Sequence, residues 1–343
     1  MKKFISRAPT RADLAGGTLD IWPLYCVLNG AVTVNVALDL WEAVEFTVEK
    51  SGDFTLDVVS GKDSDTFKAD ASFQKTAPSL RFPATLIFAY FAGREFPKLH
   101  VRAEIKTDVP RGSGLGGSSA LAVALCRGLW EIEGKSAASG WQTEMLRWVQ
   151  DFEARFLEVP TGTQDYLAAL YGGLRTYGFR YGNPEVNSLP EARLKELSDR
   201  LLVLFSGDQH QSGLSNWEIY RGFLENQSGY RVGLSELRDV ADRVNALLQS
   251  EPKWSELGKL LNQEWDIRSR VFKVNTPRLD KIIDQLRSME ILGCKVCGAA
   301  QGGSLIVLCE PAKKSAIQKT CEKDGIEVLA ARPTNKGVEI LPT

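Results

Sequence analysis

A run of glycines just before an expected helix is the segment of this sequence best suited to chemistry. Four glycines fall within six residues of the stretch Val109-Pro-Arg-Gly-Ser-Gly-Leu-Gly-Gly-Ser-Ser-Ala120. Glycine has no Cβ, so the backbone amides of such a loop can approach a ligand closely. Leucines repeat every four residues from Leu121, which predicts a helix that begins at Ser118. The free N–H groups and positive dipole end of that helix would face the loop. Together they predict an anion site, and phosphate is the commonest occupant of such sites.

The same glycines allow two other interpretations. Gly112, Gly114 and Gly117 also match the G-x-G-x-x-G fingerprint of oxidoreductases that bind a nicotinamide dinucleotide. That fingerprint requires a tight strand–turn–helix unit and an acidic residue at the end of the next strand, about twenty residues later. Glu131 and Glu133 have this spacing but lie at the end of the expected helix, so the oxidoreductase interpretation is weak. The third interpretation is a flexible turn whose following serine caps the helix.

A cation and two carboxylates come together in a second segment near the N-terminus. Arg11, Asp13 and Asp20 follow a predicted strand, and the chain between them bends at Gly16-Gly17. Taken alone, such a cluster is better interpreted as a surface turn neutralised by a salt bridge.

Two further acidic residues are separated by twelve positions. Glu153 lies beside the apolar face of an expected helix, and Asp165 lies at the start of the next one, predicted over Gln164–Tyr171. Asp165 alone is better interpreted as a carboxylate that satisfies the free amides of a helix start than as a catalyst.

The elements expected around these segments predict a mixed α+β chain of two domains. A length of 343 residues exceeds what one hydrophobic core usually serves. Alternation and β-branched residues predict that strands dominate the first hundred residues, at Phe4–Ala8, Ala31–Leu38, Glu42–Glu49, Phe54–Ser60 and Leu99–Lys106. Helices and short strands follow, without the regular alternation of a doubly wound parallel sheet. The polar segment Tyr181–Pro190 is the expected linker, which gives domains of residues 1–185 and 186–343.

The composition argues against several other classes of function. A formal net charge of −1 predicts no binding to nucleic acid or anionic lipid, and no apolar stretch is long enough to span a bilayer. His100 and His210 are the only histidines, which leaves little for a zinc site or a Ser-His-Asp triad. Six cysteines do not make a disulfide framework in a chain this long, and Cys294 and Cys297 are interpreted as ordinary reduced residues. We therefore expect a soluble cytoplasmic protein whose chemistry depends on carboxylates, hydroxyls and backbone amides.

Three segments in this order resemble the motifs of the GHMP kinase superfamily, named for galactokinase, homoserine kinase, mevalonate kinase and phosphomevalonate kinase. The first motif is similar to Ala8-Pro-Thr-Arg-Ala-Asp-Leu-Ala-Gly-Gly-Thr-Leu-Asp20, and the second to Pro110–Ser119. The third is similar to Gly293-Cys-Lys-Val-Cys-Gly-Ala-Ala-Gln-Gly-Gly303. The resemblance covers nearly the whole chain. It implies a two-domain α+β fold with the active site in the cleft between the domains.

The resemblance also implies a role for each segment. The phosphates of ATP would be bound by Pro110, Gly112, Ser113, Gly114, Leu115, Gly116, Gly117, Ser118 and Ser119. Ser118 and Glu153 would hold Mg²⁺. The catalytic residues would be Asp165, facing the acceptor hydroxyl, and Arg11, near the transferred phosphate. The acceptor would be bound by Asp13, Gly17, Thr18, Asp20 and Gln164. Phosphoryl transfer mainly needs positioning and neutralisation of charge on the phosphate oxygens, and these residue types provide both.

Within the superfamily, the chain resembles sugar kinases that act at the anomeric hydroxyl, of the D-glycero-D-manno-heptose 7-phosphate kinase and fucokinase types. The paired carboxylates of the first motif suit sugar hydroxyls, whereas mevalonate would favour a cation. Gly17-Thr18 stands where galactokinases carry Glu-His, and Ala300-Gln301 interrupts the glycine run of the third motif. The implied partners are ATP and a sugar or sugar phosphate, and the protein would be a monomer or a homodimer. A galactokinase-type or mevalonate-kinase-type enzyme, and a sugar- and nucleotide-binding sensor without turnover, remain alternatives.

Overall fold

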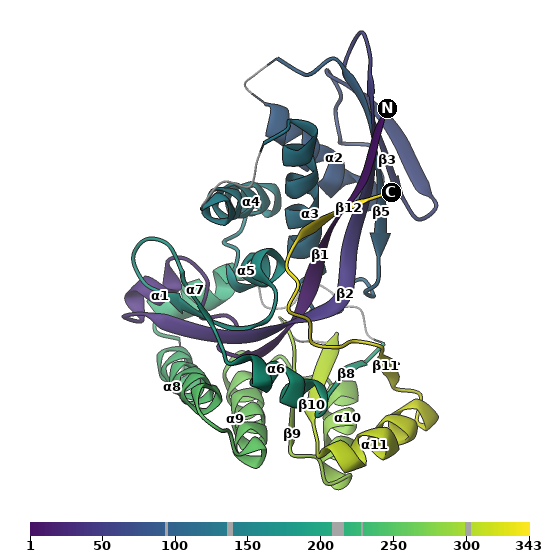
Figure 1. The fold of residues 1–343 in the computed structure, drawn as a ribbon. Coiled ribbons are helices and arrows are strands. Elements are labelled where there is room, and N and C mark those ends of the chain that lie inside the picture. Colours follow the sequence, from purple (N-terminus) through teal and green to yellow (C-terminus); the bar gives the residue numbers. More distant parts are fainter. Residues whose placement is uncertain (93–94, 136–139, 208–215, 228, 299–302) are drawn as a thin grey trace.

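Two β-sheets organise the part of the chain that a computed structural model describes: residues 1–92, 95–135, 140–207, 216–227, 229–298 and 303–343 (Figure 1). Within these residues the larger sheet has eight strands: β1 (Lys2–Ala15), β2 (Ala31–Lys50), β3 (Thr55–Ser60), β4 (Asp63–Lys68), β5 (Leu99–Thr107), β6 (Leu174–Phe179), β7 (Glu185–Ser188) and β12 (Glu339–Pro342). Its order is β12-β1-β2-β5-β3-β4, and β6 also pairs with β2 and carries β7. The second sheet has the order β11-β8-β10-β9, from β8 (Leu201–Phe205), β9 (Gly293–Val296), β10 (Ser304–Leu308) and β11 (Glu327–Leu329). The predicted α+β class is confirmed.

The long strands β1 and β2 pair along most of their length, and the first motif begins in β1. Apolar residues alternate along both, so Phe4 lies opposite Phe46 and the two rings stack with centroids 5.3 Å apart. The pairing shifts register at two points that flank Arg11. Such irregularities bend a strand and re-aim its side chains. β2 runs unbroken where the sequence predicted two strands, because residues 39 and 40 are taken up by one of these shifts.

Helices cover one face of the large sheet. α3 (Gly117–Ile132) and α5 (Gln164–Tyr171) pack on β1 and β2, and α2 (Pro78–Phe91) and α4 (Trp141–Leu157) flank α3 (Figure 1). Gly128 permits the close approach of α3, because a Cβ there would lie 2.1 Å from the ring of Phe46. The sequence did not predict α2. Its prolines, Pro78 and Pro83, are typical of helix boundaries. Pro78 stands in the first turn, where a backbone N–H would make no hydrogen bond within the helix, and Pro83 lies inside the helix.

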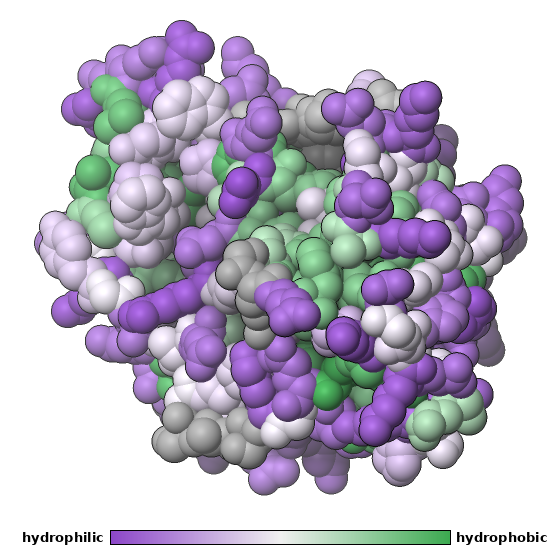
Figure 2. Space-filling view, turned by 90° about the horizontal axis from the view of Figure 1, so that it is seen from above, coloured by the Kyte–Doolittle hydropathy of each residue, from purple (hydrophilic) through white to green (hydrophobic). Residues whose placement is uncertain are grey.

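Aromatic side chains join α2 and α4. Phe82 of α2 lies edge-on to Phe152 of α4, and Tyr90 of α2 lies edge-on to Trp148 of α4, each pair with ring centroids 5.6 Å apart. Trp148 also stacks on Phe152, and Phe88 of α2 lies edge-on to Phe73. A cavity of about 720 Å³ lies among these rings. Seen from the end of the molecule that is uppermost in Figure 1, apolar side chains gather near the middle and polar ones surround them (Figure 2). This packing fixes α4, whose next residue, Glu153, points away from the aromatic cavity toward α3.

The second sheet is covered by the helices of the C-terminal half. α8 (Tyr230–Gln249) packs on α9 (Trp254–Phe272) and on β2, and α9 packs on β9. The remaining helices are α1 (Leu24–Val27), α6 (Glu191–Ser198), α7 (Asn216–Leu224), α10 (Pro277–Ser288) and α11 (Pro311–Lys323). The contacts of α8 and α9 with β2 and β1 bring the two halves together beside the first motif.

The chain crosses between the two sheets more than once. The expected linker Tyr181–Pro190 contains β7, which pairs with β6, and β12 returns to the large sheet beside β1. The large sheet therefore includes a strand from the predicted C-terminal domain. The boundary between residues 185 and 186 stays a prediction.

Across the described ranges, every helix is too short or too polar to cross a membrane.

Candidate active site

The glycine-rich segment forms a tight loop that ends at the start of α3. Gly112, Gly114 and Gly116 have φ angles of +70°, +73° and +76°, a region that other residues rarely adopt. Gly114 also needs to be small, since a Cβ there would lie 2.8 Å from the carbonyl oxygen of Cys297. The helix begins at Gly117, one residue before the predicted Ser118. Within the described part of the chain no side chain caps it, which leaves its first N–H groups available to an anion.

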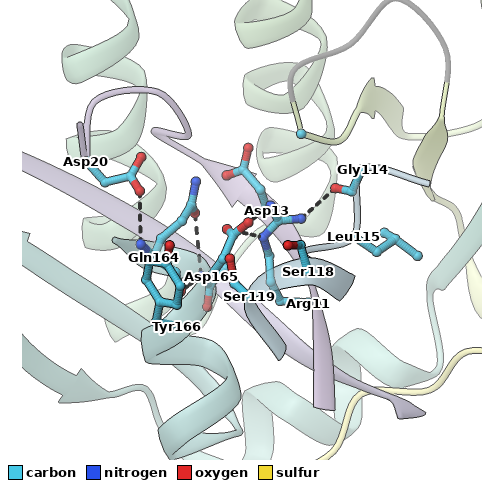
Figure 3. Close-up of polar contacts among 12 residues, drawn as sticks. Arg11, Asp13, Asp20, Gly114, Leu115, Ser118, Ser119, Gln164, Asp165 and Tyr166 are labelled. Carbon is cyan, nitrogen blue, oxygen red and sulfur yellow. Dashed lines mark hydrogen bonds and ion pairs between the residues drawn. The ribbon is translucent and has the colours of Figure 1, made fainter. Parts of the chain in front are cut away.

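Arg11 connects this loop to Asp165. Its Nε and Nη2 donate to the two carboxylate oxygens of Asp165, each at 2.7 Å, and its Nη1 donates to the carbonyl of Gly114 at 2.6 Å (Figure 3). The side chain of Arg11 is 5% exposed and that of Asp165 is 25% exposed. Burial opposes the charged form of Arg11, but the Asp165 carboxylate outweighs it and raises the arginine pKa above its usual value. The catalytic pair expected from the sequence is thus brought together at the edge of the loop.

The free amides at the start of α5 are satisfied by Asp20. Its Oδ2 accepts from the N–H groups of Thr163 and Gln164 at 2.6 and 2.9 Å, and its Oδ1 accepts from the N–H of Thr18 at 3.2 Å. Burial raises the pKa of Asp20 to about 6, against the lowering effect of these amides. Asp165 is therefore not the cap of its own helix. Since Asp20 takes that role, the Asp165 carboxylate is available to Arg11.

Ser118 and Glu153 also meet as expected. The Ser118 hydroxyl donates to Glu153 Oε1 at 2.7 Å, the Ser119 hydroxyl donates to Oε2 at 3.3 Å, and the Tyr166 hydroxyl donates to Oε2 as well. Glu153 is 4% exposed, and burial raises its pKa. The described residues contain no group of three or more histidine, cysteine or acidic side chains that could form an all-protein metal site. Mg²⁺ needs only one or two protein oxygens beside phosphate oxygens and water, so the hydroxyl and carboxylate of this pair fit it.

A buried group of charged side chains, which the sequence did not predict, is hydrogen-bonded to the first motif. Lys295 on β9 is fully buried and donates to Asp13 Oδ2 at 2.8 Å and to Glu264 Oε1 at 2.6 Å. Burial opposes every charge here, but Lys295 lowers the pKa of Asp13, and the two carboxylates raise that of Lys295. Asp13 Oδ1 is buried and has no partner within the described ranges of the chain. One signal could have revealed the group: a lysine between apolar residues in a predicted strand must have buried partners.

Two cavities meet at the glycine-rich loop. The first, of about 320 Å³, is lined by the predicted acceptor residues Asp13, Gly17, Thr18, Asp20 and Gln164, together with Arg11, Ser119, Glu153 and Asp165. The second, of about 400 Å³, is lined by Pro110, Gly112, Ser113 and Gly117 and reaches Ser60, Pro78 and Phe82. Gly114, Gly116 and Ser118 line both. Leu115 lines neither and packs in the core. Ala300, Gln301 and His210 lie outside the described residues.

Residues from both halves of the chain wall the first cavity. Arg268, Phe272 and Val274 from the C-terminal half line it opposite the first motif. Gly298, within the third motif, approaches Gly114 so closely that a Cβ on it would lie 2.8 Å from the Gly114 Cα. The three motifs predicted from the sequence therefore converge on one place.

Comparison with known protein families finds the GHMP kinases N terminal domain over residues 84–173 and the GHMP kinases C terminal domain over residues 245–326. The chain belongs to the GHMP kinase superfamily. The superfamily prediction is confirmed, and the dinucleotide-type fingerprint at Gly112–Gly117 lies within the matched kinase domain.

This GHMP kinase-family chain has relatives of similar length. It is 24% identical over 347 residues to the D-glycero-alpha-D-manno-heptose 7-phosphate kinase of Campylobacter jejuni, with 99% of both chains covered. It is 25% identical over 336 residues to the galactokinase of Mycobacterium bovis, with 88% of this chain and 87% of the relative covered. Among solved structures, a D-glycero-D-manno-heptose 1-phosphate kinase from Bacteroides thetaiotaomicron matches with a TM-score of 0.75, 18% identity and 99% of both chains covered. The last likeness supports the GHMP fold.

Proposed function

We propose that this GHMP kinase-family protein transfers the γ-phosphate of ATP to a hydroxyl of a sugar or sugar phosphate, at the anomeric position, as a D-glycero-D-manno-heptose 7-phosphate kinase does. One observation carries the proposal. The glycine-rich loop separates two cavities, and the Arg11–Asp165 pair lines the first of them and is hydrogen-bonded to Gly114, which lines both. A donor in one cavity and an acceptor in the other would therefore be held with their reacting groups at the same loop.

The cavity beside α2 suits the nucleotide. Phe82, Pro83 and Val109 offer it an apolar wall for a base, and the free amides of the loop and of α3 suit the phosphates. Ser118 and Glu153 would hold Mg²⁺ on the side of the loop that faces the first cavity. When bound, the ion would neutralise charge on the phosphate oxygens.

The other cavity suits the acceptor. Asp165 keeps part of its carboxylate exposed while Arg11 fixes its orientation with two parallel hydrogen bonds. In this arrangement Asp165 would accept or orient the proton of the attacking hydroxyl, and Arg11 would compensate negative charge next to the loop. Because the arginine remains beside it, the carboxylate would contribute mainly through orientation and electrostatics.

Two features support a sugar as the acceptor. Asp13 Oδ1 is buried, has no hydrogen-bond partner among the described residues and belongs to a residue that lines the cavity, so it could accept from a hydroxyl. The relatives whose names give a substrate act on a heptose phosphate and on galactose. The Asp20 carboxylate is largely occupied by backbone amides, which makes its proposed contact with the acceptor secondary to its role at α5.

We extend the proposal to the remaining features of the protein. The polypeptide would act in the cytoplasm, as a monomer or a homodimer, with residues 1–185 and 186–343 as its two domains. These assignments have independent tests in fractionation, in light scattering and in limited proteolysis.

A panel of acceptors tests the proposed function. ADP release is followed with Mg²⁺-ATP and heptose 7-phosphate, fucose, galactose, mannose, mevalonate or homoserine. The proposal expects stimulation by a hexose- or heptose-type sugar, bare or phosphorylated. Stimulation by mevalonate or homoserine alone would reject the sugar assignment but not the superfamily. Binding of sugar and nucleotide without ADP release would favour a sensor.

A further inference from the structure

Arg268, on α9, makes hydrogen bonds to two sides of the acceptor cavity. Its Nη1 donates to the carbonyl of Gly17 at 3.1 Å and to the hydroxyl of Thr18 at 2.9 Å, and its Nη2 donates to the carbonyl of Gly298 at 2.8 Å. The residue is 2% exposed and lines the cavity. Its Nε is buried and has no hydrogen-bond partner among the residues that the structure describes. A buried cation with one N–H unpaired lowers stability, and groups of this kind deserve a functional explanation.

The turn that Arg268 holds is strained. Thr18 has a φ of +88°, a conformation that a β-branched residue rarely adopts because it is strained. Such a conformation persists only where the surroundings fix it. Here the Thr18 hydroxyl accepts from Arg268 and the Thr18 N–H donates to Asp20. Asp20 in turn caps α5, the helix that carries Asp165.

The other end of the Arg268 guanidinium, at Nη2, lies next to the glycine-rich loop that is proposed to bind phosphate. Gly298 packs directly on Gly114: a Cβ on Gly298 would lie 2.8 Å from the Gly114 Cα, and a Cβ on Gly114 would lie 2.8 Å from the carbonyl oxygen of the preceding residue, Cys297. Gly114 also accepts from Arg11, the partner of Asp165. The planar guanidinium of Arg268 thus links the Gly17–Thr18 turn to the glycine-rich loop. It donates hydrogen bonds to three oxygen atoms.

We propose that Arg268 is a positioning residue for phosphoryl transfer, which fixes the strained Gly17–Thr18 turn against the phosphate loop and so sets the approach of the acceptor hydroxyl to the γ-phosphate. The proposal rests on the proposed function. It concerns a side chain that touches the protein framework of both cavities and acts through Thr18, Asp20 and Gly298. A lysine cannot replace it, because one ammonium cannot reach acceptors on both sides of the cavity in fixed geometry.

The test compares Arg268→Lys and Thr18→Val with wild type, using the acceptor found active in the panel. For Arg268→Lys, kcat should fall by roughly 10- to 100-fold and the acceptor KM should rise, since misplacement by about 1 Å costs on the order of 10²-fold. The dissociation constant for ATP should stay within about 2-fold, because the loop amides are intact. More than one ADP should be released per phosphorylated sugar, because water can react when the acceptor is misplaced. Thr18→Val keeps the side-chain shape and removes one acceptor, so it should act in the same direction with a smaller effect.

Arg270→Lys is the matched control, since Arg270 lies on the same helix, is exposed and pairs with Glu236. It should leave kcat, KM and the ADP-to-product ratio unchanged. The inference is overturned if Arg268→Lys still releases one ADP per phosphorylated sugar and loses activity only in proportion to the unfolded protein. It is also overturned if Thr18→Val has the same kcat and acceptor KM as wild type. A wild-type protein that phosphorylates no acceptor would instead reject the proposed function.

Discussion

At the scale of single residues, the site depends on pairs of side chains in which one fixes the orientation of the other by hydrogen bonds. Arg11 binds Asp165 through two hydrogen bonds and Gly114 through a third, so the carboxylate has one orientation. Ser118 and Glu153 are in a similar relation across α3 and α4. Preorganised groups of this kind need no reorientation when the substrates bind.

Replacement of Asp165 tests the first pair. Asp165→Asn keeps the shape of the side chain but removes its negative charge. General-base assistance is typically worth 10²–10⁴-fold, and because Arg11 stays beside the carboxylate we expect kcat to fall by roughly 10²-fold. ATP affinity, measured by calorimetry, should barely change. Turnover within a few-fold of wild type would show that Asp165 takes no part in transfer.

Glu42 gives a pH-dependent prediction. It is 6% exposed, accepts from the Thr107 hydroxyl at 2.7 Å and lies beside Gly117, and burial raises its pKa from 4.5 to about 8. The folded protein therefore keeps a proton that the unfolded chain releases, and the free energy of unfolding should fall as pH rises from about 4.5 to 8. The slope for one proton is at most about 1.4 kcal/mol per pH unit.

Urea unfolding of Glu42→Gln across this pH range measures the effect. The variant should lose that part of the slope, so its difference from wild type grows steadily toward pH 8. Glu49→Gln, exposed on the same strand, is the control and should follow wild type. Parallel curves for wild type and Glu42→Gln would contradict the protonated state of this residue.

At the scale of elements, helix starts decide where the functional groups point. α3 begins without a side-chain cap and leaves its amides free, whereas α5 is capped from a distance by Asp20. The sequence could predict both helices from their apolar spacing. It could not predict which carboxylate caps α5, because Asp20 and Gln164 are adjacent only through the pairing of β1 with β2 and the packing of α5 on both.

Asp20→Ala should lower both stability and activity. Loss of a helix cap costs about 1–2 kcal/mol, and α5 would then hold Asp165 less firmly. Thr276 provides the matched control, because its hydroxyl caps α10 by accepting from the Leu279 N–H at 3.2 Å. Thr276→Ala should lose a similar amount of stability with unchanged kcat in the folded protein. If the two variants have equal activity, the link from Asp20 to Asp165 is wrong.

The bridge between α3 and α4 predicts a metal effect. Ser118→Ala and Glu153→Gln should weaken ATP binding in the presence of Mg²⁺ by about 10-fold or more, since even the outer partners of metal ligands contribute 10- to 100-fold to affinity. Binding of ATP without Mg²⁺ should change much less. Glu144→Gln, exposed on α4, should match wild type in both conditions. Calorimetry with and without the metal separates these cases, and equal losses in both would reject the metal role.

At the scale of the whole molecule, local patterns predicted the parts that depend on neighbours in sequence. The glycine loop, the helix at Ser118 and most strands of the large sheet follow from spacing, whereas β4 and β7 were not predicted. The resemblance joined the three motifs. The buried group of Lys295, Asp13 and Glu264 was missed, because its members are brought together only when β9, β1 and α9 pack. Arg268 was missed for the same reason: its partners belong to the first and third motifs.

The central claim is that phosphate passes between the two cavities that meet at the glycine-rich loop. The direct test incubates the protein with Mg²⁺ and ATP labelled in the γ-phosphate, together with D-glycero-D-manno-heptose 7-phosphate or a hexose, and separates nucleotide from sugar. The account predicts that the label moves to the sugar in an amount equal to the ADP formed, and that Asp165→Asn slows this transfer by roughly 10²-fold while ATP still binds. Binding of both ligands by the wild-type protein with no label on any acceptor would contradict it.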